Sequence, residues 1–363
     1  MKTLFVGDIC PSASSLSSTV EENAKNLFGD TLKIFAQSDF AFANLECAIS
    51  ESENTIKKFG PNLKVPLSAA PLLKRIGVTV AGLSNNHIFD FGREGAHDTI
   101  NALTRAGVDY TGFGDNYKDS RKNYVFEKNG EKVCIIAVCE HEYSYALDDR
   151  MGSRPFDEFD TMEDIRLAKQ TSDRVVVIYH GGKEHCEYPS PRLLRVCRAM
   201  VRCGADMVLC QHSHCIGTYE NYMGAHIVYG QGNFIFQPLI DSEAWKTGLA
   251  ISYDTKTGEI EFIPIRQIDR SENVRLVKGD KKDTILSEFA KRSEKIKTGE
   301  WKDGWHLFCE SVSENYINFI SRAQAPDATE FDNDIFGHLL DCEAHTDVLR
   351  ELFPTYNLTN EKD

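Results

Sequence analysis

The sequence predicts a layered α/β fold that carries a helical extension at its C-terminal end. In the first two-thirds of the chain, short continuous apolar runs alternate with segments whose apolar residues recur at helical spacing. From about Ala225 the runs alternate apolar and polar residues, as half-buried antiparallel strands do, and beyond Lys278 the periodicity is helical. The alternation of strands and helices indicates a parallel sheet in the first part, and the later strands should make the sheet system mixed.

Strand and helix signals follow one another in order along the first 210 residues. Continuous apolar runs, typical of strands buried on both faces, occupy residues 3–6, 40–43, 78–83, 132–138, 175–179 and 207–210. Helical spacing predicts helices near residues 19–36, 69–76, 92–105, 161–171 and 191–203. Gly77, Gly107 and Gly204 stand where three of these helices should end, because glycine is favoured just past the last helical residue.

The last third of the chain combines short strands with helices. Residues 249–253 and 260–265 should form a hairpin, since Lys256-Thr257-Gly258 supplies a turn between them. We therefore expect a domain over residues 1–278 and a helical extension over residues 279–363. For the extension we expect a role in packing, or in forming a homo-oligomer, rather than in catalysis.

Composition excludes several classes of protein. With 41 Lys and Arg against 55 Asp and Glu, the formal charge is -14, so we expect no binding to nucleic acid or to anionic lipid. An anionic substrate would then need a local positive charge, which a bound metal ion supplies. The 11 cysteines are odd in number and include no Cys-x-x-Cys pair, which is typical of reduced thiols. We expect a cytoplasmic protein without a leader or a membrane anchor.

Metal-capable side chains follow several of the predicted strands. The clearest is the pair His212 and His214, directly after the run at 207–210. A lone His-x-His pair also occurs by chance on protein surfaces, but other strands end in the same way, and strand ends are where open sheets place their sites. Nitrogen, carboxylate and amide ligands suit Mn, Zn or Fe rather than a Cys-rich structural zinc site. We take six such residues as candidate metal ligands: Asp8, Glu46, Asn86, His180, His212 and His214. Six ligands are too many for one ion that keeps an open coordination position and about right for two ions.

His87 is the candidate acid–base residue. It follows Asn86, and it would protonate or steady a leaving oxygen while Asp90 orients its ring. The alternative is that Asn85-Asn86-His87 caps a helix and that the histidine is only hydrogen-bonded. Lys183 and Glu184 follow Gly181-Gly182 on a loop that faces either the site or solvent.

Six motifs in order closely resemble the CapA family, which is named for poly-gamma-glutamate capsule biosynthesis and belongs to the calcineurin-like metallophosphatase superfamily. The match runs from residue 2 to about residue 240 and rests on Gly7-Asp8-Ile9, Asn44-Leu45-Glu46, Asn85-Asn86-His87 with Asp90-Phe91-Gly92, His180-Gly181-Gly182-Lys183-Glu184 with Tyr188-Pro189-Ser190-Pro191, Gln211-His212-Ser213-His214 after Gly204-Ala205-Asp206, and Gly230-Gln231-Gly232-Asn233-Phe234. The resemblance implies a four-layer α/β/β/α sandwich of two mixed sheets.

The resemblance also implies roles for the residues. Asp8 would hold a first metal and Glu46 would bridge, Asn86 and His180 would hold a second metal, and His212 and His214 would divide between the two. His87 matches the leaving-group histidine of the superfamily, and Glu184, Asn233 and Asn85 would line the substrate pocket.

Two positions depart from the superfamily pattern. Cys10 replaces the histidine of the usual Asp-x-His, so the first metal site should be weak unless the thiolate ligates, and Glu46 stands where aspartate is usual. The favoured function is a metal-dependent hydrolase that attacks an anionic phosphoester through a metal-bound water. The alternatives are a non-catalytic protein that binds a glutamyl polymer in the same cleft, and an enzyme that cleaves gamma-linked amide bonds there.

Overall fold

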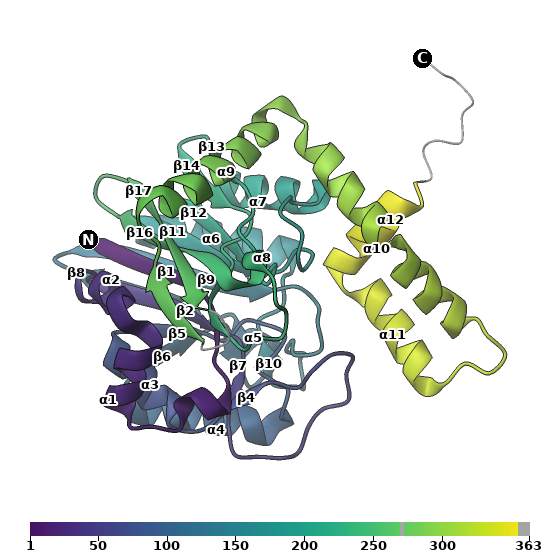
Figure 1. The fold of residues 1–363 in the computed structure, drawn as a ribbon, viewed down its shortest axis with the longest axis horizontal. Helices are drawn as coiled ribbons and strands as arrows, with labels where there is room; N and C mark the ends of the chain where they lie inside the picture. Colours follow the sequence, from purple (N-terminus) through teal and green to yellow (C-terminus); the bar gives the residue numbers. More distant parts are fainter. Residues whose placement is uncertain (269–271, 355–363) are drawn as a thin grey trace.

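Two β-sheets packed face to face form the centre of the structure, and helices cover both outer faces (Figure 1). The computed structural model describes residues 1–268 and 272–354. Phe5 and Phe42 of one sheet meet Ile135, Ile178 and Leu209 of the other in the apolar layer between the sheets. This four-layer α/β/β/α arrangement confirms the fold class expected from the sequence.

The first sheet contains the strand that opens the chain. Its order is β18-β17-β16-β1-β2-β5-β6, and β15 also pairs with β1. Strands β2, β5, β6 and β15 extend the parallel part around β1, whereas β16, β17 and β18 are antiparallel. The bounds are β1 (Lys2–Cys10), β2 (Phe40–Leu45), β5 (Val80–Gly82), β6 (Asp109–Thr111), β15 (Asn233–Phe236), β16 (Thr247–Asp254), β17 (Ile260–Ile268) and β18 (Asn273–Leu276).

The second sheet has the order β13-β14-β12-β11-β9-β8. Its four central strands are parallel and its two edge strands are antiparallel. The bounds are β8 (Tyr124–Lys128), β9 (Glu131–Cys139), β11 (Arg174–His180), β12 (Met207–Gln211), β13 (Tyr219–Tyr222) and β14 (Ala225–Val228). Two small ladders lie beside the sheets: β3 (Ala48–Ile49) with β4 (Lys64–Val65), and β7 (Phe113–Gly114) with β10 (Gly152–Ser153).

Helices α3 (Ala69–Ile76) and α4 (Gly92–Ala106) pack on the first sheet, and α6 (Glu158–Thr171) and α7 (Pro191–Cys203) pack on the second. As expected, α3, α4 and α7 end at Gly77, Gly107 and Gly204, each in the left-handed conformation. Helix α7 begins sharply because the Ser190 hydroxyl accepts a hydrogen bond from the Leu193 amide and proline occupies the first helical position. Short helices are η1 (Ala13–Leu16), α5 (Tyr117–Ser120) and α8 (Glu243–Lys246).

The prediction of one continuous helix over residues 19–36 is wrong. The segment is divided into α1 (Val20–Asn23), a π-helical turn (Ala24–Phe28), a 3-10 turn (Gly29–Thr31) and α2 (Leu32–Ala36). Gly29 has φ +44°, and a Cβ there would lie 2.5 Å from the Arg275 guanidinium carbon. The apolar periodicity still buries this segment against the first sheet, but the glycine divides the helix.

The C-terminal extension consists of α9 (Gly279–Thr298), α10 (Trp301–Ala323), α11 (Glu330–Asp341) and α12 (Glu343–Leu352); residues 355–363 lie outside the described part. Helix α9 packs on β13 and β17, and α10, α11 and α12 pack on one another beside the sheets (yellow-green, Figure 1). Trp305 and Val348 join the buried cluster on the outer face of the second sheet. The division into domains at residue 278 stays a prediction. None of the helices described within 1–268 and 272–354 has the length and apolarity needed to cross a bilayer.

Candidate metal centre

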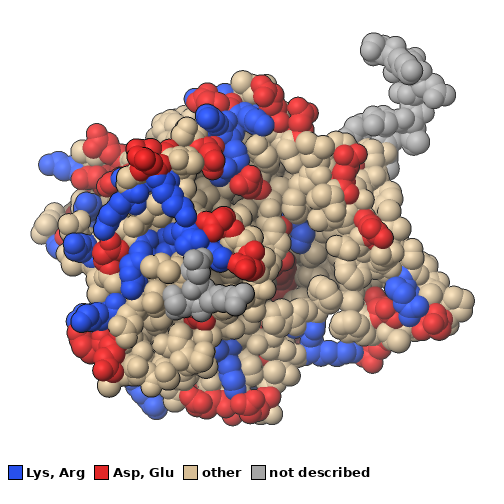
Figure 2. All heavy atoms as spheres, viewed as in Figure 1, with Lys and Arg blue, Asp and Glu red and all other residues tan. Residues whose placement is uncertain are grey.

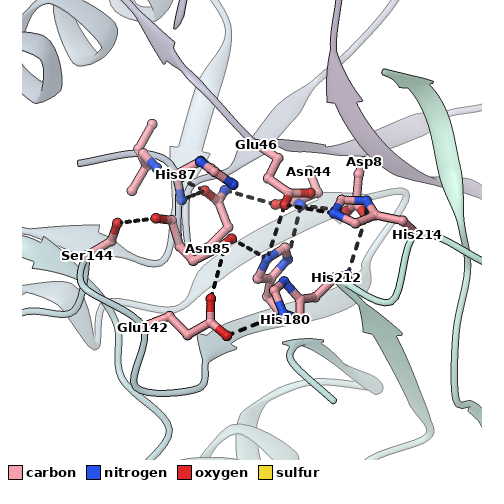
Figure 3. Close-up of polar contacts among 12 residues, drawn as sticks. Asp8, Asn44, Glu46, Asn85, His87, Glu142, Ser144, His180, His212 and His214 are labelled. Atoms are coloured by element: carbon pink, nitrogen blue, oxygen red, sulfur yellow. Dashed lines mark hydrogen bonds and ion pairs between the residues drawn. The ribbon is translucent and has the colours of Figure 1, made fainter. Parts of the chain in front are cut away.

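The six candidate ligands come together between the two sheets. The first sheet supplies Asp8 within β1 and Glu46 directly after β2, and the second sheet supplies His180 at the end of β11 and the two histidines after β12 (Figure 3). Asn86, which follows β5 of the first sheet, has its Oδ1 3.0 Å from His180 Nε2. Each of the six side chains is buried. Strand ends from both sheets therefore place nitrogen and oxygen ligands around one point.

Glu46 stands at the middle of this arrangement. Its Oε1 lies 3.6 Å from His180 Nε2 and 3.7 Å from His214 Nε2 (Figure 3). Glu46 belongs to two sets of three residues, one with His212 and His214 and the other with Asp8 and His180. Within each set, the possible ligand atoms lie within 4.8 Å of one another. Because Glu46 belongs to both sets, its position is that of a carboxylate shared between two neighbouring cation positions.

The environment of Glu46 fits a divalent cation. The residue is 0% exposed, and neither of its carboxylate oxygens has a hydrogen-bond partner. Burial, followed by the charge of Asp8, raises the pKa of Glu46 well above its usual range. His212 Nδ1 is also buried without a partner. A buried carboxylate among imidazoles is costly unless it gains a proton or a cation, so the donor set fits a metal ion.

The backbone after β12 is strained in a way that directs both imidazoles. His212 has φ +83° and His214 has φ +52°, a region that non-glycine residues rarely adopt. Each such conformation costs on the order of 1–3 kcal/mol. The two rings are 6.0 Å apart, and both belong to the Glu46 set of possible ligands.

Asn233 fixes the orientation of the His214 ring. Its amide nitrogen donates to the Trp245 carbonyl at 2.9 Å, so its Oδ1, 2.8 Å from His214 Nδ1, faces the ring as an acceptor. With Nδ1–H donating to Asn233, His214 Nε2 keeps its lone pair toward Glu46. β1 and β15 bring Asp8 into register with Asn233, and a Cβ on Gly7 would lie 2.0 Å from the Gly232 carbonyl oxygen. The two glycines are therefore needed for this close approach.

Asn44 was quoted in the sequence motif but given no role, and the structure places it inside the site. Its Nδ2 lies 2.7 Å from Asp8 Oδ1 and 3.2 Å from His180 Nδ1. Asn85 in turn donates to Asn44 Oδ1 and to the Leu45 carbonyl, and its own Oδ1 accepts from two backbone amides. These contacts hold the Asn85 side chain in place, and the substrate contact expected for it stays a prediction.

His87 lies beside the metal-ligand cluster with two charged neighbours. Its Nδ1 is 2.7 Å from Asp90 Oδ2, as expected, and 3.0 Å from Lys58 Nζ. Lys58 also donates to Asp90 Oδ1 at 2.5 Å. No sequence motif indicated Lys58, because it lies in a loop 29 residues before His87. Burial, followed by the charge of Lys58, lowers the pKa of His87.

Comparison with known proteins identifies the family. The family model "Bacterial capsule synthesis protein PGA_cap" matches residues 2–238. The chain belongs to this family. It is 30% identical to the capsule biosynthesis protein CapA of Bacillus anthracis over 244 residues, 63% of this chain and 58% of that protein. It is 28% identical to the PGA biosynthesis protein CapA of Bacillus subtilis over 271 residues, 72% of this chain and 70% of that protein.

A solved structure shows a likeness at lower identity. A putative 5'-nucleotidase from Staphylococcus aureus, in complex with alpha-ketoglutarate, aligns with 14% identity and a TM-score of 0.44, covering 80% of this chain and 58% of that one.

Cys10, the main departure of this PGA_cap member from the superfamily pattern, lies apart from both ligand sets. Its thiol is 0% exposed and accepts a hydrogen bond from Gln237 Nε2 at 3.4 Å. Burial and the neighbouring Cys47 raise the pKa of the Cys10 thiol well above its usual range. Because Cys10 belongs to neither set of possible ligand atoms and its thiol contacts Gln237, we assign it a packing role. The candidate ligands near Asp8 are thus fewer than the superfamily pattern supplies.

Two acidic residues from loops complete the surroundings of the His212 ring. Glu142, which follows β9 and was not singled out in the sequence, has Oε2 2.9 Å from Asn86 Nδ2 and Oε1 3.4 Å from His212 Nε2. Burial lowers the pKa of His212, but the charge of Glu142 outweighs it and raises that pKa to about 9. At Glu184, burial is likewise outweighed by Lys183 and by the two histidines after β12, which lower its pKa to about 2. Both carboxylates are therefore charged beside the cluster.

Proposed function

We propose that this PGA_cap family member is a metal-dependent hydrolase that acts on a phosphoester at the Glu46 cluster. The observation that carries the proposal is the Glu46 carboxylate, fully buried and without a hydrogen-bond partner, between the ring nitrogens of His180 and His214. Mixed nitrogen and oxygen ligands suit Mn, Zn or Fe, as one ion or two. When bound, such an ion supplies Lewis acidity and positive charge to the reaction.

The chain's own residues supply proton transfer and orientation. His87 is held through Nδ1 by Asp90, so Nε2 is the ring nitrogen available to a leaving oxygen. Asp90 is fixed in turn by the backbone amide of Leu63 at 2.7 Å, which makes it a positioning residue. Lys58 adds a positive charge 3.0 Å from the same ring, where it would stabilise an anionic leaving group.

A cleft of about 570 Å³ leads away from Lys58. It runs between the loop at residues 56–59, the loop at 143–150 and helix α11, and its lining includes Lys57, Arg150 and the aromatic rings of Phe59 and Tyr143. The lining also holds Glu330, Asp334 and Asp341, and Lys57 pairs with the first two of these. Lys58 and Arg150 are therefore the basic groups that would meet a small or polymeric anionic substrate. On the face in view, Lys and Arg side chains gather over the left part of the molecule beside Asp and Glu (Figure 2).

Membership of a capsule synthesis family supports a second candidate: a gamma-linked glutamyl polymer that is bound or cleaved in the same cleft. Such a polymer is anionic, and cleavage of its amide bond needs the same Lewis acid as a phosphoester. The two candidates are separated by comparing turnover of aryl phosphoesters with turnover of a glutamyl oligomer. Hydrolysis of the oligomer alone would replace the phosphoesterase proposal, and binding without turnover of either would indicate a non-catalytic protein.

The decisive experiment combines metal analysis with turnover. The purified chain should bind Mn, Zn or Fe and hydrolyse a generic aryl phosphodiester faster when Mn is added. His180→Ala should abolish turnover and keep the fold, whereas His97→Ala, an exposed histidine on α4, serves as the matched control and should leave turnover unchanged. A protein that binds no metal and shows no metal-stimulated activity would contradict the proposal.

We also propose that the protein works in the cytoplasm. All eleven cysteines are free, and Cys197 Sγ lies 3.6 Å from Cys210 Sγ without a bond. Free thiols in such proximity persist best in a reducing compartment. Thiol titration of protein purified without reductant from its native host should find eleven reactive groups after unfolding.

A further inference from the structure

Four residues outside the Glu46 cluster form another set of metal-capable side chains. Glu142, His338, Cys342 and His345 each offer a ligand atom, and these atoms all lie within 4.8 Å of one another. One member comes from the loop after β9, and the other three come from α11, from the residue between α11 and α12, and from α12. Residues nearly 200 positions apart in the chain are thus brought together by the packing of the extension.

The break between α11 and α12 directs the thiol into this set. Cys342 has extended backbone angles, φ -75° and ψ 128°, and its side chain makes no capping hydrogen bond to α12. Instead Cys342 Sγ lies 3.4 Å from Glu142 Oε1, and the cysteine is 0% exposed. His338 and His345 stand four residues before and three residues after Cys342, so both rings reach the same point, with their centroids 5.0 Å apart.

Neighbouring side chains hold the possible ligands in place. The Tyr316 hydroxyl is 2.7 Å from His345 Nδ1, which leaves Nε2 of that ring available. The Tyr143 ring stacks on His338 with centroids 4.4 Å apart and an interplanar angle of 24°. Glu142 is fixed by the Asn86 amide at 2.9 Å. Outer contacts of this kind orient ligands in metal sites and fix the tautomer of a ligating histidine.

We propose that Glu142, His338, Cys342 and His345 form a second, structural metal site that takes zinc and fastens helices α11 and α12 to the loop after β9. Two imidazole nitrogens, one thiolate and one carboxylate complete a tetrahedral zinc site with no open position, which is typical of structural rather than catalytic zinc. Binding releases the thiol proton to solvent, and the charges of the thiolate and of Glu142 then balance that of the ion. The site touches the Glu46 cluster through Glu142, which contacts Asn86 and His212, but the proposal does not rest on hydrolysis there.

The thiolate gives this site a spectroscopic signature. The full chain is stripped with chelator, reloaded with Co²⁺ and examined for the near-ultraviolet thiolate-to-cobalt charge-transfer band. We expect the band in the wild type and its loss in Cys342→Ser. Cys10→Ser is the matched control and should retain the band, because Cys10 is equally buried but lies on β1, two residues after Asp8 of the other cluster.

Zinc content gives an independent readout that does not require the cysteine variant to fold. His338→Ala, at a half-buried position, should bind about one zinc ion fewer per chain than the wild type, whereas His306→Ala, an exposed histidine of α10, should bind as many. Absence of the band in the wild type, its survival in Cys342→Ser, its loss in Cys10→Ser, or unchanged zinc content in His338→Ala would each overturn the proposal.

Discussion

Replacing Glu46 by glutamine should stabilise the metal-free protein and remove its response to metal. The Glu46 carboxylate is 0% exposed with both oxygens unpartnered, and an unsatisfied buried acceptor costs about 1–3 kcal/mol, more when it is charged. Glutamine keeps the shape and removes the charge, so in chelator we expect the free energy of unfolding to rise by about 1–3 kcal/mol. In the wild type, Mn at 100 times its Kd should add about 2.7 kcal/mol, a gain that the variant loses.

The assay is urea unfolding of both proteins, in chelator and in saturating Mn. Glu163→Gln, which removes an exposed carboxylate 3.6 Å from Arg166, is the matched control. It should change the free energy of unfolding by no more than about 0.5 kcal/mol and should keep the full response to Mn. The reasoning fails if Glu46→Gln lowers stability in chelator, or if Mn stabilises the variant as much as the wild type.

Three further changes test other contacts. Asn233→Ala removes the acceptor at His214 Nδ1 and should lower metal affinity about 10–100-fold in calorimetric titration. Unchanged affinity would mean that Asn233 does not orient the His214 ring. His87→Ala should lower the kcat for an aryl phosphodiester about 100–10,000-fold while metal content stays the same; an equal loss of metal would assign it to the ligand set instead. Arg154 is 2% exposed, and its guanidinium lies 2.6 Å from Asp164 Oδ2. Asp164→Asn removes this carboxylate and should lower the free energy of unfolding in urea by about 3–5 kcal/mol. A loss below about 1 kcal/mol would refute this expectation.

The convergence of Asp8, Glu46, His180 and the two histidines after β12 could be expected from the sequence, because each follows or ends a continuous apolar run. Parallel strands end at the same edge of a sheet, so the pattern of runs also fixes where the polar residues meet. Register, however, is set by contacts that are distant in the chain. The approach of Gly7 to Gly232, which aligns β1 with β15, has no local signal.

The residues that the sequence did not reveal lie in loops or act through other residues. Lys58 and Glu142 have no periodic pattern around them, and only the folded chain brings them to His87 and His212. Gly29 divides the helix expected over residues 19–36, although the apolar spacing on either side is helical. The extension was expected only to pack or to form an oligomer, yet Cys342 contacts Glu142 beside the Glu46 cluster. The spacing of apolar residues does not predict this contact, because helix–helix packing depends on side-chain shape.

The central claim is that Glu46 and the surrounding imidazoles hold a divalent cation. A crystal soaked in Mn and measured for anomalous scattering tests it most directly. The account predicts an anomalous peak about 2.0–2.2 Å from a Glu46 carboxylate oxygen, within ligating distance of at least one of the rings of His180, His212 and His214. Anomalous density absent from this position, with Glu46 hydrogen-bonded only to water or protein, would contradict it.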